Sequence, residues 1–198
     1  MARCDNCPTT GPRGKHCQND AFREFQYEEI QSDLIDAIKQ FYQREFDLIT
    51  IGANEVCITS YIFHYFLMRF AEKYSDYNID PEYNRNGFGA KYYFRDSYAK
   101  PDLIIHKRKC NKHNLLYVEF KVGKNDHNPL DKEKIVRFVS NEYGSENGKL
   151  VAPYRYCYGV SIILNKYIVR MLWYRNGYME PFCENKFNTK DWELIADE

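Results

Sequence analysis

Two strand-like runs joined by a polar turn dominate the middle of this chain, in the segment PDLIIHKRKCNKHNLLYVEFKVG (101–123). Both runs are rich in aliphatic and aromatic residues that favour strands, whereas the linking RKCNKHN run is polar and turn-like. The segment therefore predicts an antiparallel hairpin centred near Cys110 and Asn111. Residues equidistant from that centre lie opposite each other, so Asp102 should face Glu119, with Cβ atoms roughly 4.5–5.5 Å apart.

Side chains alternate between the two faces of a strand, and the second run follows this alternation. One face is wholly apolar and is expected to be buried. The other face carries an acid and a base two residues apart. The two sets are Leu116, Val118, Phe120 and Val122 on the first face, and Tyr117, Glu119 and Lys121 on the second.

This pattern is typical of metal-assisted chemistry. Two close carboxylates such as Asp102 and Glu119 repel each other unless a cation lies between them. Two carboxylates can hold a hard divalent cation, and the ammonium of Lys121 can stabilise a developing oxyanion, which together suit phosphodiester hydrolysis. The alternative interpretation is a surface hairpin whose Glu and Lys face solvent.

A further acid, Glu55, opens a predicted helix over 54–74. Asn54 is a plausible N-cap, and apolar residues recur every four positions from Ile58 to Phe70. Helical spacing places Glu55 on the same inward face, where a carboxylate is costly unless it is paired or bound to metal. Equally, a first-turn glutamate can favour the helix dipole and reach solvent.

The remaining pattern predicts an α/β fold with a mixed β-sheet flanked by helices, in the order α-α-β-β-β-α-β-β. Helices are expected at 24–46, 54–74 and 131–143, the last with Ile135, Val136, Phe138 and Val139 inward. A strand-like segment that ends in a Gly-rich turn should precede the hairpin over 78–89, and two more strands should meet at a tight Asn165-Lys166 turn. A loop is expected at 144–148. From Phe187 onward the chain is polar and acidic, and Trp192 is expected to anchor it.

Composition indicates one folded domain over 21–198, preceded by a Cys-containing tail or small knob over 1–20. Hydrophobic residues form 44% of the chain and aromatic residues 17%, which excludes a disordered protein. No apolar run approaches the ~20 residues that span a bilayer, and no apolar leader is visible, so we expect no membrane association and a cytoplasmic location. Seven cysteines in a reducing compartment indicate free thiols.

The net charge is zero, but the charge is unevenly distributed. Residues 100–137 hold about ten Lys/Arg against about five Asp/Glu, whereas residues 20–36 hold about six acids and one arginine. A basic excess around the acid pair suits a phosphate-backbone binder, although solvated surface charge explains most such runs. The candidate nucleic-acid contacts are Arg85, His106, Arg108 and Lys124. Arg85 could instead form a structural salt bridge with Glu82.

The N-terminal segment carries a second candidate metal site. Cys4 and Cys7 have zinc-knuckle spacing, and His16 and Cys17 follow. Adjacent His and Cys are awkward as two ligands, so a tail with free thiols is the favoured interpretation and Zn²⁺ the alternative.

With Asp102, Glu119 and Lys121 in place, the chain resembles the PD-(D/E)xK nuclease superfamily, whose fold is restriction-endonuclease-like. More narrowly, it is similar to a group of small prokaryotic proteins of unassigned function that share four short motifs. The motifs stand here, within about 50–165, as Asn54-Glu55, Glu82-Tyr83-Asn84-Arg85, Pro101-Asp102-Leu103-Ile104-Ile105-His106-Lys107-Arg108, and Asn114-Leu115-Leu116 leading to Glu119 and Lys121.

This resemblance implies a metal-dependent nuclease acting on nucleic acid, with DNA as the expected substrate, in a defence or mobile-element system. It implies that Asp102 and Glu119 bind Mg²⁺ or Mn²⁺, that Glu55 binds it directly or through water, and that Lys121 orients or deprotonates the attacking water and stabilises the pentacovalent phosphate. A homodimer is left open, since many restriction-like enzymes are dimers. The alternative is a catalytically silent nucleic-acid-binding or protein-interaction module on the same scaffold.

Overall fold

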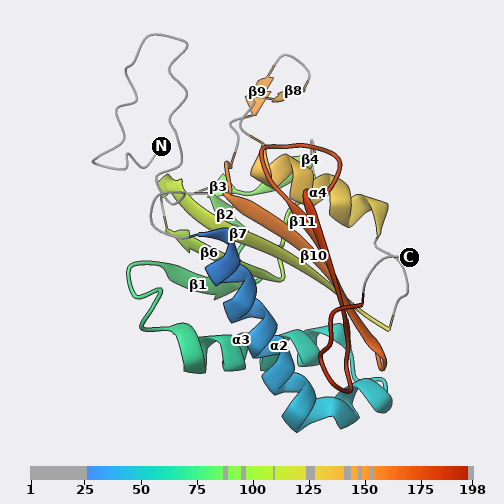
Figure 1. Ribbon diagram of the computed structural model, residues 1–198. Helices are drawn as coiled ribbons and strands as arrows, with labels where there is room; N and C mark the ends of the chain where they lie inside the picture. The colour runs from blue at the N-terminus through green and yellow to red at the C-terminus, as the bar shows by residue number, and fades with distance from the viewer. Residues whose placement is uncertain are drawn as a thin grey trace.

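The centre of the protein is a six-stranded mixed sheet with helices on both faces (Figure 1). Its strands lie in the order β1-β6-β7-β10-β11-β12, and β10 runs parallel to β7 while the other neighbours are antiparallel. The computed structural model describes residues 26–86, 89–94, 97–108, 110–123, 128–140, 144–146, 149–151 and 154–195.

The elements of this central unit follow one another along the chain much as predicted. They are α2 (Tyr27–Thr50), α3 (Glu55–Phe70), β1 (Asn78–Pro81), β6 (Leu103–Lys107), β7 (Cys110–Val122), α4 (Pro129–Val139), β10 (Tyr158–Leu164), β11 (Ile168–Tyr174) and β12 (Cys183–Asn188). The order α-α-β-β-β-α-β-β is thus found, with β12 as one strand more.

Three two-stranded sheets lie outside the main sheet. Gly144–Glu146, expected as a loop, instead forms a strand, because it pairs antiparallel with the segment that follows it. The pairs are β2 (Arg85–Asn86) with β3 (Gly89–Ala90), β4 (Tyr92–Phe94) with β5 (Ser97–Tyr98), and β8 (Gly144–Glu146) with β9 (Lys149–Val151).

Strand β12 was missed because its sequence, CENKFN, is polar. An edge strand has a neighbour on one side only, and here β11 supplies the backbone partners. Phe187 is the one buried residue of β12, so the sequence of this strand shows little hydrophobic pattern. The second helix is also shorter than predicted: Asn54 caps it by accepting a hydrogen bond from the Cys57 amide at 2.8 Å, but it ends at Phe70.

The sheet separates two apolar clusters. On one face, the inward residues of α2 and α3 pack against Leu116, Val118 and Phe120, the face of β7 that was predicted to be buried. On the other face, α4 packs Ile135 and Phe138 with Tyr117 and other tyrosines. The second face of β7 is therefore covered as well, which rules out the solvent-facing hairpin. Within the described residues no helix is long and apolar enough to span a bilayer.

Helix α4 reaches the sheet closely because β10 carries Gly159 at the crossing. A Cβ atom at this position would lie 2.4 Å from Ile135 Cγ2 and 2.9 Å from Val139 Cγ1. Both contacts are shorter than van der Waals distance, so a larger residue forces α4 or the side chains of Ile135 and Val139 to shift. Glycine here sets the height of α4 above β7 and β10.

We therefore expect Gly159→Ala to lower the free energy of unfolding by about 1–3 kcal/mol, because overpacking forces the helix or its side chains to shift. Urea unfolding followed by circular dichroism measures this. The surface variant Met68→Ala, at a residue that is 73% exposed, should change stability by less than about 0.5 kcal/mol. Equal stability of Gly159→Ala and the unchanged protein would show that α4 has room to move.

Candidate functional site

The register of β6 and β7 brings Asp102 and Glu119 together as the hairpin predicts. Leu103 is paired with Val118, so Asp102, one residue before β6, lies opposite Glu119. The Phe120 amide donates a hydrogen bond to Asp102 Oδ2 at 2.6 Å, which ties the acid to the strand beside Glu119.

The turn itself differs from the symmetrical hairpin. Lys107 pairs with Cys110, so the chain reverses two residues earlier than the expected centre. Register shifts on either side of His106 then restore the predicted pairing at the far end. Such bulges insert residues into one strand without disturbing the pairing beyond them.

Glu119 is a buried acid, with 3% of its surface exposed. The Tyr117 hydroxyl donates a hydrogen bond to Glu119 Oε1, and Lys134 Nζ lies 3.7 Å from Oε2. Burial, followed by the charge of Asp102, raises the pKa of Glu119 to about 8. Burial likewise raises the pKa of Asp102 to about 6, against the lowering effect of the Phe120 amide and Lys121.

Glu55 reaches the same end of β7 from the first turn of α3. Its Oε1 lies 3.1 Å from Lys121 Nζ, and its Oε2 accepts a hydrogen bond from the Val122 amide at 3.2 Å. Its side chain is 35% exposed. The Glu55 side chain is therefore neither buried in the apolar face of α3 nor directed only at solvent. It pairs with Lys121.

Two residues of α4, Asp131 and Lys134, complete the site, and neither was predicted from the sequence. Asp131 has a side chain only 3% exposed, and its Oδ1 lies 2.9 Å from Lys134 Nζ while its Oδ2 lies 3.4 Å from Lys121 Nζ. Both fall on the inward face of the predicted helix, together with Ile135 and Phe138. Helical phase applied to polar residues, as it was for Glu55, would have found them.

Acids and lysines thus alternate along a charge chain, which we define as Glu55–Lys121–Asp131–Lys134–Glu119. It crosses from α3 over β7 to α4 and back to β7. Burial alone would lower the pKa values of Lys121 and Lys134, but the neighbouring carboxylates raise both overall. Both lysines therefore stay protonated at neutral pH.

The charges in this region do not balance. Four carboxyl groups (those of the charge chain and Asp102) face two lysines, so full ionisation leaves 4 − 2 = 2 negative charges. Burial is the main cause of the raised pKa values of Glu119 and Asp102, and the neighbouring carboxylates add to it. A divalent cation would remove that excess.

The donor set fits a hard cation held at few points. Within the described ranges no three His, Cys, Asp or Glu side chains gather closely enough to hold a metal ion. The strand register places Asp102 and Glu119 opposite each other, whereas Glu55 and Asp131 both contact Lys121. Mg²⁺ commonly uses one or two carboxylates and completes its shell with water and phosphate oxygens, so this pair suits it.

The predicted nucleic-acid contacts have different surroundings. His106 is buried beneath Tyr83 and bonds Asp80 at 2.9 Å, so it serves the fold and does not face solvent. Arg108 is exposed, but its guanidinium binds Asp80 as well. Arg85 is exposed. Glu82, which was considered as its salt-bridge partner, instead pairs with Lys100 at 2.7 Å. Lys124, and the zinc candidates Cys4, Cys7, His16 and Cys17, lie outside the described residues.

Comparisons with known proteins assign no relative to this chain: no protein-family model matches it, and no curated protein or solved structure is detectably similar.

The raised pKa of Glu119 makes a prediction about stability. Its carboxyl holds a proton in the folded state up to about pH 8, but only to about 4.5 in the unfolded chain. The folded state therefore binds more protons between these values, and the free energy of unfolding falls as pH rises from 5 to 8. In Glu119→Gln, we expect this decrease in the free energy of unfolding between pH 5 and 8 to be smaller by on the order of 2 kcal/mol.

Urea unfolding in EDTA at several pH values measures the difference. The matched control is Glu133→Gln, which replaces an exposed glutamate on α4 and should keep the pH dependence of the unchanged chain. If Glu119→Gln shows that same dependence too, Glu119 is ionised throughout and the buried acid pair is better compensated than its surroundings indicate.

Proposed function

We propose that this protein is a metal-dependent nuclease that hydrolyses phosphodiester bonds, with Asp102 and Glu119 holding Mg²⁺ or Mn²⁺. One observation carries the proposal: Asp102, directly before β6, lies opposite Glu119 of β7, and Lys121 follows on the same face of β7. Excess negative charge in that region supports a cation site.

The bound cation would supply Lewis acidity and an activated water. The protein's own contribution is to hold the groups around it. Lys121, fixed between Glu55 and Asp131, presents an ammonium beside the acid pair. Because its pKa is raised, Lys121 suits stabilisation of the negative charge on the pentacovalent phosphate better than removal of a proton from water. Asp131 and Lys134 act as positioning residues.

The fold supports the same proposal at a coarser level. We infer that the mixed sheet is a restriction-endonuclease-like core, because its acids and lysine occupy the antiparallel pair next to a parallel strand, with helices before and after. The basic excess of residues 100–137 suits a phosphate backbone. By resemblance, the substrate is DNA in the cytoplasm of a prokaryote.

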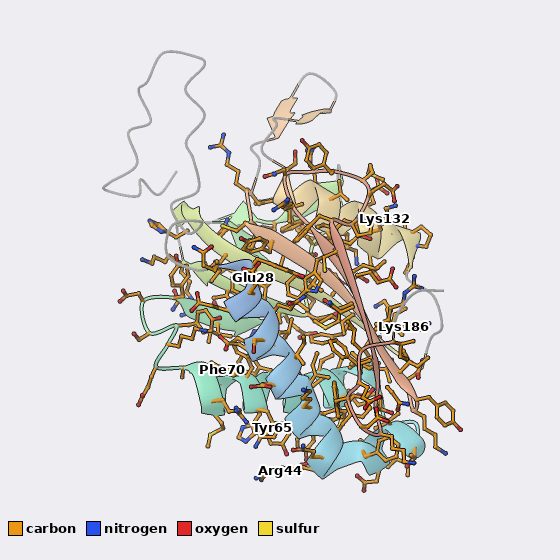
Figure 2. The ribbon with its side chains drawn as sticks, in the orientation of Figure 1. Glu28, Arg44, Tyr65, Phe70, Lys132 and Lys186 are labelled. Carbon is orange, nitrogen blue, oxygen red and sulfur yellow. The ribbon has the colours of Figure 1, made fainter. Side chains whose placement is uncertain are left out.

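Cleavage of labelled DNA and RNA, single- and double-stranded, tests the activity. We expect cleavage with Mg²⁺ or Mn²⁺ and none in EDTA. Asp102→Ala should lower kcat at least about 10³-fold, and Lys121→Ala about 10²–10³-fold, because each removes charge stabilisation from the transition state. Lys132→Ala is the matched control. Lys132 lies on α4, the helix that also carries Asp131 and Lys134, and its ammonium pairs at 3.4 Å with exposed Glu180 (Figure 2). Loss of activity in this control, or cleavage retained in Asp102→Ala, would contradict the assignment.

A second candidate is a catalytically silent nucleic-acid-binding or protein-interaction module. The observation that favours it is the engagement of the acids by protein groups: Glu119 by Tyr117 and Lys134, and Glu55 by Lys121. In that case the charge chain is a structural network that replaces a metal.

Metal affinity separates the two functions. Since Glu119 must lose its proton to bind a cation, we expect the affinity for Mn²⁺ to rise between pH 6 and 8 by about tenfold or more, with proton release. Isothermal titration in two buffers of different ionisation enthalpy measures both. Asp102→Asn should abolish binding, whereas Glu133→Gln should retain it. Absence of Mn²⁺ binding at pH 8 in the unchanged chain would favour the silent module.

A further inference from the structure

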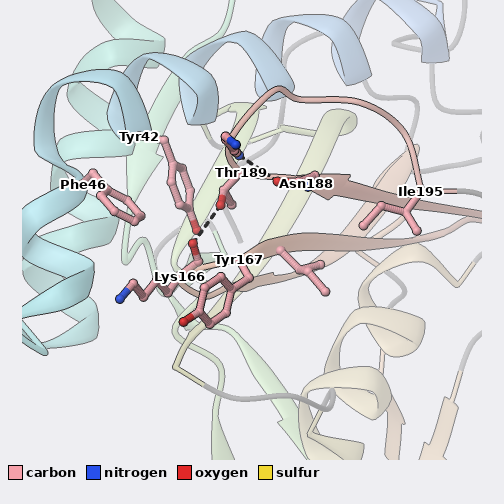
Figure 3. Close-up of a pocket in the computed structure, with 9 residues that line it drawn as sticks. Tyr42, Phe46, Lys166, Tyr167, Asn188, Thr189 and Ile195 are labelled. Atoms are coloured by element: carbon pink, nitrogen blue, oxygen red, sulfur yellow. Dashed lines mark hydrogen bonds between the residues drawn. The ribbon is translucent and has the colours of Figure 1, made fainter.

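A pocket of roughly 700 Å³ lies away from the acid pair, at the turn between β10 and β11. Figure 3 shows Tyr42 and Phe46 of α2 on one side and the Lys166-Tyr167 turn on the other. Tyr167 is 69% exposed, and Lys166 Nζ lies 5.6 Å from the centre of its ring. Ile168 and Ile195 add apolar surface, and Tyr42, only 5% exposed, lies at the bottom of the pocket, so the pocket offers aromatic and apolar surface to a flat ring.

The rim of this pocket is basic. Lys166 and Lys190 line it and are exposed, and no carboxylate of the described residues lies within ion-pair distance of either. Lys39 lies close by, over the ring of Trp192, which itself contacts Tyr42. An aromatic pocket edged by lysines that no described carboxylate neutralises is complementary to a planar group that carries negative charge.

The pocket is adjacent to the candidate catalytic end of the sheet. Leu164, the last residue of β10, is paired with Val122, and the Gly123 amide donates to the Leu164 carbonyl at 2.9 Å. The next residue, Asn165, accepts a hydrogen bond from the Tyr42 hydroxyl at 2.8 Å. With strands about 4.8 Å apart, the turn lies on the order of 10–15 Å from Lys121.

The two sites open on different sides of the sheet. Asp102 and Glu119 face α4, whereas Tyr42 and Phe46 belong to α2 on the opposite face. A ligand that occupies both must turn round the end of the sheet past Lys121 and Glu55. Duplex DNA is stiff over about 150 base pairs and keeps its bases stacked inside, so it cannot follow this path. A single strand can, because its backbone is flexible and its bases are free to stack on aromatic side chains.

We propose that the Tyr42–Phe46–Tyr167 pocket is a nucleobase subsite, which takes one unpaired base of a single-stranded nucleic acid while Lys166 and Lys190 bind the adjoining phosphates. The proposal rests on the proposed nuclease function and names its substrate class: single strands, or the unpaired ends of duplexes. The base stacks on the exposed ring of Tyr167, about one to two nucleotides from the phosphate at Lys121.

Binding without cleavage tests the subsite. Fluorescence anisotropy in EDTA compares a labelled 12-nucleotide oligothymidylate with a 12-base-pair duplex. We expect the single strand to bind at least about tenfold more tightly, and Tyr167→Ala to weaken it about tenfold. The matched control is Tyr178→Ala, because Tyr178 is 68% exposed and follows β11 at the opposite end of the sheet. It should bind as the unchanged chain does.

Two further readouts separate a binding role from a structural one. The double variant Lys166→Ala, Lys190→Ala should reduce the slope of log affinity against log salt by about 1.4, the value for two phosphate contacts to a single strand. Oligothymidylate should also quench the fluorescence of Trp192, which lies against Tyr42, and Trp192→Phe should remove that quenching.

The outcomes are distinct from those of the cleavage assays. Equal affinity for single strand and duplex, or unchanged binding by Tyr167→Ala, overturns the subsite even if the protein cleaves DNA. Selective, Tyr167-dependent binding supports the subsite even if no metal restores cleavage, in which case it is the nuclease proposal that fails.

Discussion

The buried charge chain between α3, β7 and α4 is the interaction on which the arrangement of the molecule depends. Burying an ion costs several kcal/mol unless a partner and hydrogen bonds compensate it. Asp131 and Glu119 are both almost fully buried, and each has a lysine of the chain as partner. Removing either lysine leaves carboxylates uncompensated between the sheet and a helix, so the chain also fixes where α3 and α4 can sit.

Strand β7 makes this possible because both of its faces are covered. Its apolar face holds α2 and α3, and its polar face lies under α4, which Gly159 allows to approach closely. Polar side chains that would be solvated on a one-sided sheet are desolvated here. That desolvation raises the pKa values of Asp102 and Glu119, and it is also what gives electrostatic interactions the strength that catalysis requires.

The surplus of acid over base connects this network to the proposed chemistry. A purely structural network would be expected to balance its charges, whereas this one has two carboxylates more than lysines. The surplus lies at the opposed pair, where the resemblance to PD-(D/E)xK nucleases predicts a cation. Beyond it, the sheet end continues into a basic turn and an aromatic pocket, so charge changes from negative at the acids to positive at Lys166 and Lys190.

Much of this was accessible from sequence because it depends on local periodicity. Alternation along 115–122 separated Glu119 and Lys121 from the apolar face, and helical spacing located the buried stripe of α3 and the inward residues of α4. Pairing symmetry placed Asp102 opposite Glu119, although the turn lies elsewhere and bulges restore the register. The edge strand β12 was missed because a strand with one neighbour needs few apolar residues.

By itself, then, the sequence determined the order of the central elements up to β11, the faces of β7 and the meeting of Asp102 with Glu119, since these follow from the period of each element and from one hairpin. Only the tertiary structure decided that Glu55 pairs with Lys121, and that Asp131 and Lys134 enter the site from α4. The tertiary structure alone also brought Tyr42 and Tyr167 to one pocket, although most strands of the sheet lie between these two residues in the sequence. Such contacts depend on how helices cross the sheet, which is set by packing between distant segments and leaves no periodic signal in the chain.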